Sequence, residues 1–193
     1  MECSNDKTGI NTTQEKDQLD SLIIYYQKGN MSTCIEKGNS FVIKHSDNDI
    51  GWQVLGGAYL IQVQDSLAEI CTKKAILLNP NNSAALTNYA ILLDKREKHN
   101  EAEIYYKKAI KVSPAMAQAY SNYVGNRLIT GDYKTAVICG EKAVALADNL
   151  KDKGVLCVAY HKAGMHVKRD SLYRELEKLN YTHLGDLKEI FNN

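Results

Sequence analysis

The spacing of apolar residues predicts helical hairpins. In the segment that begins at Asp49, the side chains of Trp52, Leu55 and Tyr59 recur at three- and four-residue intervals, so one side of a helix is apolar. That face must be covered, and the residues that follow supply a second helix, which ends at Pro80 because proline cannot continue it. The pattern therefore predicts a pair of helices packed face to face.

This hairpin recurs with a period of 34 residues. Trp52, Leu86 and Tyr120 are each 34 residues apart and have similar neighbours, which indicates an internal repeat. In the same register, small residues form two columns, and we expect the helix axes to approach most closely there. The columns are Ala68, Ala102 and Ala136, then Ala75, Ala109 and Ala143.

Extending the period in both directions predicts five hairpins. Their boundaries fall near 15–48, 49–82, 83–116, 117–149 and 150–183. The first and last hairpins match less closely, since Cys34 and Arg169 stand in alanine columns. Residues 1–14 are polar and predict a flexible arm. Residues 184–193 predict a capping helix, with an apolar side formed by Leu184, Leu187, Ile190 and Phe191.

The recurring residues resemble the tetratricopeptide-repeat (TPR) family. Its pattern of an aromatic residue, Leu-Gly, Tyr, a Gly-Asp turn, two alanines and a proline is present as Trp52, Leu55-Gly56, Tyr59, Ala68, Ala75, Pro80 and Gly131-Asp132. The resemblance implies an all-α fold, a right-handed α-solenoid of about five TPR helix pairs plus a C-terminal capping helix. It also implies that a protein or peptide partner binds in the concave groove.

The resemblance further implies that the groove is lined by the first helix of each hairpin. The candidates are Ile23, Tyr26, Gln53, Val54, Leu60, Ile61, Asn88, Ile91, Asn122, Leu128 and Ile129. Asn88 and Asn122 share the sixth place of their repeats, similar to the asparagine ladder of protein O-GlcNAc transferases, and a side-chain amide can donate to and accept from a peptide backbone. Two other interpretations stay open: the asparagines serve only the stack or its hydration, and some apolar candidates fill gaps between first helices.

Charge and composition narrow the kind of partner. A net charge of +1 without a local Lys/Arg cluster argues against nucleic acid. No stretch approaches twenty apolar residues, and the N-terminus lacks the apolar core of a signal peptide, so we expect no membrane insertion and a cytoplasmic protein. Five cysteines without a CxxC pair predict no disulfide framework. Self-association is possible but is not predicted.

No catalytic or metal-binding motif stands out. There is no P-loop, no GxSxG elbow and no Gly-rich dinucleotide turn. Only Cys157 and His161 fall one helical turn apart as a metal pair would, whereas zinc normally takes three or four protein ligands. We therefore expect no enzyme activity, no metal and no cofactor. The carboxylate clamp of chaperone-binding TPR proteins is not expected either, since only Asn88 matches among its places, which hold Gln53, Gly57, Asn88, Gln118 and Asn122.

The sequence thus predicts a non-enzymatic adapter or scaffold. Two alternatives remain. One is a secretion-type chaperone that shields an apolar segment of a client. The other is a targeting TPR region that works with a separate glycosyltransferase or sulfotransferase, because the first two repeats resemble the start of bacterial enzymes of that kind.

Overall fold

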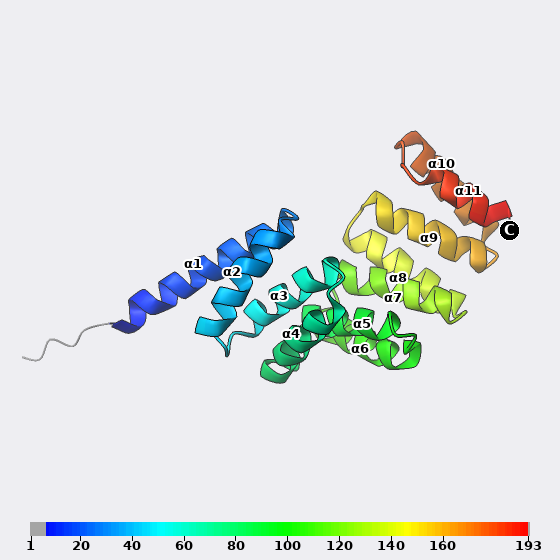
Figure 1. The fold of residues 1–193 in the computed structure, drawn as a ribbon. Helices are drawn as coiled ribbons and strands as arrows, with labels where there is room; N and C mark the ends of the chain where they lie inside the picture. Colours follow the sequence, from blue (N-terminus) through cyan, green and yellow to red (C-terminus); the bar gives the residue numbers. More distant parts are fainter. Residues whose placement is uncertain (1–6, 193) are drawn as a thin grey trace, which may run out of the picture. The chain divides into compact units, whose positions relative to one another are not determined.

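The computed structural model describes residues 7–192, and its regular elements there are all helices (Figure 1). The predicted all-α fold is confirmed for this part of the chain. The elements are α1 (Lys7–Gln27), α2 (Met31–Lys44), α3 (Asp49–Ile61), α4 (Asp65–Leu78), α5 (Ser83–Asp94), α6 (His99–Val112), α7 (Ala117–Ile129), α8 (Tyr133–Leu146), α9 (Leu150–Lys162), α10 (His166–Lys178) and α11 (Leu184–Asn192).

The chain divides into two compact units, residues 1–92 and 93–193, with the boundary inside α5. In the first unit α1 packs on α2 and α3, and α3 packs on α4. In the second unit α7 packs on α6, α8 and α9, and α9 also contacts α8, α10 and α11. The first helices α3, α7 and α9 therefore each lie against their own hairpin partner and against the hairpin before it.

The N-terminal arm differs from the expectation. α1 begins at Lys7, so residues 7–14 are helical, and residues 1–6 lie outside the described residues. The stretch has no apolar face to mark it as helix, but extending an existing helix adds one hydrogen bond per residue without a new nucleation step. A polar sequence can therefore continue a helix whose apolar face begins further along.

The two alanine columns lie where helices meet. Ala68, Ala102 and Ala136 are fully buried, and Ala75, Ala109 and Ala143 are buried almost completely. A side chain without atoms beyond Cβ leaves room for the backbones to approach, which a larger residue at these places would prevent.

Each hairpin turns through a residue in the left-handed backbone region. These residues share the fifteenth place of their repeats and are Gly29, Val63, Glu97, Gly131 and Gly164, with φ between +58° and +79°. In four of the five turns the next N–H donates to the carbonyl oxygen five residues back, as Gln64 does to Tyr59. This hydrogen bond closes the end of the first helix and reverses the chain.

The last helix covers an apolar end of the second unit. Leu187 of α11 is buried against Cys157 of α9 and Leu176 of α10, and Leu184 and Phe191 pack around them. The helix lies on the face predicted from its apolar spacing.

Candidate functional site

Several groove candidates of the first unit serve the interior. Val54 is buried in the apolar core rather than on an open face, and Ile23, Tyr26 and Leu60 are half-buried against the same core. The Tyr26 hydroxyl lies where a Cβ on Gly57 would come within 2.8 Å of it, so α1 and α3 approach closely there. Burial, with a smaller effect of Cys34, raises the pKa of Tyr26. For these residues the gap-filling interpretation describes the structure.

Ile61 lies differently. It is the last residue of α3 and is 54% exposed, although its side chain is apolar. Gln53 of the same helix and Ile91 of α5 are half-buried. The open part of the predicted groove in the first unit therefore lies toward the end of α3.

Asn88 of α5 is buried but incompletely bonded. The residue is 5% exposed, and its Nδ2 has no hydrogen-bond partner within the described part of the chain. A buried donor left without an acceptor costs about 1–3 kcal/mol. Neighbouring Thr87 satisfies its own hydroxyl by donating to the Ser83 carbonyl oxygen (2.8 Å). The Asn88 amide is thus an unpaired polar group on a helix that the sequence assigns to the groove.

The second unit holds the remaining candidates on α7. Asn122 and Leu128 are half-buried, whereas Ile129 is the last residue of the helix and is exposed. Ile61 and Ile129 share the thirteenth place of their repeats. An exposed isoleucine therefore ends the first helix of a hairpin in each unit.

A buried ion pair in the second unit was missed from the sequence. Arg127 of α7 is 5% exposed, and its Nη2 lies 2.9 Å from Glu103 Oε2 of α6. Its Nε and Nη2 donate to Asn126 Oδ1, and its guanidinium lies over the Tyr123 ring. Burial alone would raise the pKa of Glu103, but hydrogen bonds from Lys107 and Tyr123 and the charge of Arg127 hold that pKa below its usual value.

A second polar cluster surrounds Asp94 at the end of α5. Its carboxylate faces His99 Nδ1 (2.8 Å) and accepts hydrogen bonds from Tyr106 (3.0 Å) and Asn126 Nδ2 (2.6 Å). The Asn126 amide therefore joins the Asp94 cluster to Arg127. These charged groups bind one another across α5, α6 and α7, which indicates a structural role.

The described thiols and histidines form no reactive or metal-binding centre. Burial raises the pKa of Cys34, Cys71 and Cys139 to about 11, and that of Cys157 to about 12. All four are free and buried, so thiolate chemistry is suppressed. Residues 7–192 contain no group of three or more His, Cys, Asp or Glu side chains placed to hold a metal ion. None of the helices found there has the length and apolar character needed to cross a bilayer.

Comparison with known families supports the repeat. Residues 71–104 match a family model described as a tetratricopeptide repeat, and this segment has the length of one period. No curated protein sequence matches the chain significantly. The similarity to the repeat region of O-GlcNAc transferases that the sequence suggested finds no support in these comparisons.

Solved structures share the fold over most of the chain. A thermophilic TPR protein of Thermus thermophilus is 17% identical, with 92% of this chain and 97% of that chain covered at a TM-score of 0.72. The pilF protein of Pseudomonas aeruginosa is 16% identical, with 85% and 75% covered at 0.72. MamA of Desulfovibrio magneticus RS-1 is 16% identical, with 86% and 94% covered at 0.66. The chain therefore has the helical-repeat fold of TPR proteins.

Proposed function

We propose that this chain is a non-enzymatic adapter that holds a peptide or helix of a partner protein against its first helices. Tetratricopeptide-type folds bind protein partners, and this chain combines such a fold with first helices that carry exposed apolar side chains. The exposed side chain of Ile61 at the end of α3 carries the proposal.

The Asn88 amide supports a peptide ligand by its chemistry. Its Nδ2 has no acceptor among residues 7–192, and a half-turn of the amide exchanges the positions of its donor and acceptor ends. The Nδ2 atom is out of contact with solvent, so the carbonyl oxygen of an extended peptide would accept from it only after the Asn88 side chain turns outward. Such a bond contributes about 1 kcal/mol. Asn122 holds the equivalent place in the second unit.

The exposed isoleucines supply the apolar part of the surface. Ile61 and Ile129 keep apolar side chains in solvent at the same place of two repeats. Each would contribute roughly 1–2 kcal/mol if a ligand buried it completely, because about half of each side chain is already covered. We therefore infer a ligand that offers both backbone carbonyl groups and apolar side chains.

A matched pair of variants tests this surface. Ile61 on α3 and Ile104 on α6 are both 54% exposed, so changing either to serine removes similar apolar area. Peptides are first selected against the purified chain from a displayed random library, and their affinities are measured by fluorescence anisotropy. We expect Ile61→Ser to weaken binding at least tenfold at an unchanged melting temperature, and Ile104→Ser to leave binding unchanged.

Asn88 gives an independent readout of the same proposal. Asn88→Leu removes the unpaired donor, so we expect the protein to be at least as stable as the original while peptide affinity falls about fivefold. Equal loss of affinity in Ile61→Ser and Ile104→Ser, or full affinity in Asn88→Leu, would contradict binding on the first helices.

The chaperone and targeting roles are narrower forms of the same activity. Preference for a long apolar client segment would support the chaperone role. Sugar transfer by the purified chain would overturn the adapter proposal, whereas transfer that requires an added enzyme would support the targeting role. Four free, buried cysteines support a reducing compartment, and on this basis we propose the cytoplasm.

A further inference from the structure

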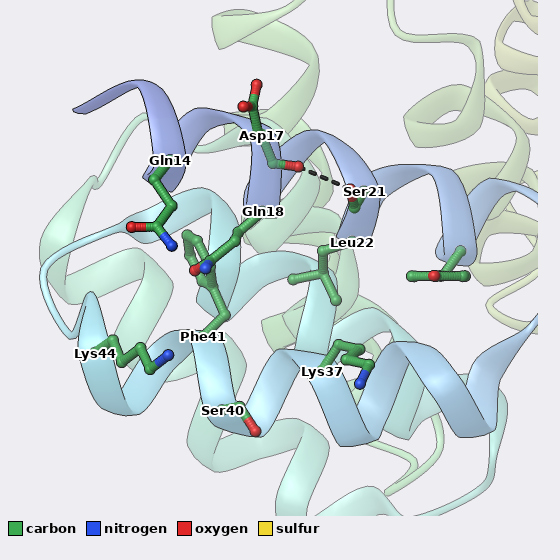
Figure 2. Close-up of a pocket in the computed structure, with 10 residues that line it drawn as sticks. Gln14, Asp17, Gln18, Ser21, Leu22, Lys37, Ser40, Phe41 and Lys44 are labelled. Atoms are coloured by element: carbon green, nitrogen blue, oxygen red, sulfur yellow. Dashed lines mark hydrogen bonds between the residues drawn. The ribbon is translucent and has the colours of Figure 1, made fainter. Parts of the chain in front are cut away.

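The first hairpin has a hollow between α1 and α2, and both helices contribute to its lining. It has a volume of about 570 Å³, with Leu22 and Phe41 among its apolar lining residues. Figure 2 shows polar side chains from both helices around it, including Ser21 of α1 and Ser40 and Lys44 of α2. None of the proposed groove residues lines this hollow.

The second unit contains a corresponding hollow, which a third helix, α8, also lines. A hollow of about 450 Å³ in the fifth repeat is lined by α9 and α10 and also by Glu141, Val144 and Ala145 of α8. Counted from the start of each repeat, the two hollows share lining places 4, 7, 11, 23 and 26. α8 is the second helix of the preceding hairpin, and the described residues contain no helix before α1 to take that position.

Tyrosine at the eleventh place of a first helix contacts the second helix of the preceding hairpin. The Tyr160 hydroxyl donates to Glu141 Oε1 of α8 (2.8 Å), and the Tyr59 hydroxyl hydrogen-bonds the Asn39 amide of α2 (2.9 Å). Glu141 and Asn39 both hold place 25 of the preceding repeat. In each unit, therefore, a tyrosine of a first helix is hydrogen-bonded by a carboxylate or carboxamide of the second helix before it.

Tyr25 holds the same place in the first repeat but has no such partner. It lines the hollow, and its hydroxyl makes no hydrogen bond within the described part of the chain. In the two repeats without tyrosine at this place, Leu93 has no side chain able to hydrogen-bond, and Arg127 of α7 pairs with Glu103 of the preceding α6. In the first hairpin, the Tyr25 hydroxyl is thus a donor for which the described residues provide no acceptor.

The charges around the hollow favour a carboxylate over an amide as the acceptor for the Tyr25 hydroxyl. Lys44 has no acidic partner among residues 13–192, and Lys37 pairs only with its exposed neighbour Glu36 (3.3 Å). Asp17 is the one acidic side chain in the described lining. The junction at α8 shows a comparable arrangement, because Glu141 there accepts from both Tyr160 and Lys168.

We propose that the hollow between α1 and α2 binds an amphipathic helix of a partner protein, which packs on α1 as α8 packs on α9 and carries a glutamate that accepts a hydrogen bond from Tyr25. The flanking face of that helix is small or apolar, as Val144 and Ala145 are beside Glu141. This inference does not depend on the proposed groove, because the two surfaces share no residue.

The chain's own α8 sequence provides a defined probe. The probe is a fluorescein-labelled peptide of residues 133–146, held helical by a hydrocarbon staple that replaces the exposed pair Lys134 and Ile138. Fluorescence anisotropy against the full chain measures its affinity. We expect Ser21→Arg and Ser40→Arg, which fill the hollow from opposite helices, to abolish binding while circular dichroism shows an unchanged fold.

A double-mutant cycle tests the hydrogen bond. Tyr25→Phe removes only the hydroxyl and should weaken binding about tenfold, as should Glu141→Ala in the peptide, because a hydrogen bond to a charged group is lost in each case. The two changes together should cost no more than either alone. Tyr120→Phe, in the second unit, is the matched control and should change nothing. Hydrogen exchange should show protection in α1 and α2.

Three results would overturn the proposal: binding unaffected by Ser21→Arg and Ser40→Arg, additive losses in the cycle, or no binding at millimolar peptide. A dimer of the chain that dissociates in Ser21→Arg would show that a second copy occupies the hollow. If Ile61→Ser, and not the serine-to-arginine variants, abolished binding of the α8 peptide, the peptide would be bound in the groove. That result would overturn the present proposal but not the adapter function.

Discussion

Val63 and Gly131 hold the same turn position in different repeats, and exchanging their residue types measures the strain in one turn. Val63 has φ of +58°, a left-handed conformation that costs an L-residue about 1–2 kcal/mol. It is 72% exposed, so a change to glycine removes little packing. Against this gain, glycine destabilises the folded state by about 0.5–1 kcal/mol, because it gives the unfolded chain more conformational freedom. We expect Val63→Gly to stabilise the protein by about 0.5–1 kcal/mol.

The reverse change provides the control. A Cβ added to Gly131 would meet no atom within 4 Å, so Gly131→Val tests backbone conformation without a steric clash. We expect it to destabilise the second unit by about 1 kcal/mol. Urea unfolding followed by circular dichroism at 222 nm measures both variants. A less stable Val63→Gly together with a neutral Gly131→Val would refute the reasoning and show that the apolar side chain of Val63 stabilises its turn.

Three further outcomes follow from the packing and the charges. Arg127→Met should cost about 1–3 kcal/mol, measured by the same unfolding assay, because the buried Asn126 oxygen loses its donor while Glu103 keeps Lys107 and Tyr123 as partners. Ala102→Leu should cost about 1–3 kcal/mol by overpacking a fully buried site. Burial, with nearby positive charge, lowers the pKa of His161, so the unfolded chain binds more protons and the free energy of unfolding should fall as the pH drops below about 6.5. That slope should diminish in His161→Gln.

The repeat architecture could be predicted because its causes are local and periodic. The 34-residue spacing of Trp52, Leu86 and Tyr120 set the phase, and α3, α5 and α7 begin where that phase places a repeat. The alanine columns were predicted as contact sites, and they are buried. The helical start of α1 was missed because residues 7–14 carry no apolar face.

The candidate site was harder to predict, because a place in a repeat does not fix exposure. Val54 and Ile61 were both assigned to the groove, yet Val54 packs into the core while Ile61 ends its helix and is exposed. Their difference depends on the neighbouring helices, which the repeat pattern does not describe.

One signal for the polar clusters was present in the sequence. Arg127 holds the eleventh place of its repeat, where the other repeats have Tyr25, Tyr59, Leu93 and Tyr160. A charged side chain at a place otherwise taken by partly apolar residues requires a buried partner. Among the described tyrosines of this column, only the Tyr25 hydroxyl lacks an acceptor from a preceding helix. That Glu103 is the partner of Arg127 could not be predicted from the sequence and is shown by the structure.

Hydrogen exchange of the chain with a library-selected peptide tests the adapter proposal most directly. We expect slower amide exchange on peptide binding in α3 and α5, the first helices that carry Ile61 and Asn88. Exchange in α4 and α6 should stay unchanged, including around the exposed Ile104. Protection confined to α4 and α6, with none in α3 and α5, would contradict binding on the first helices and place the binding surface on the second helices.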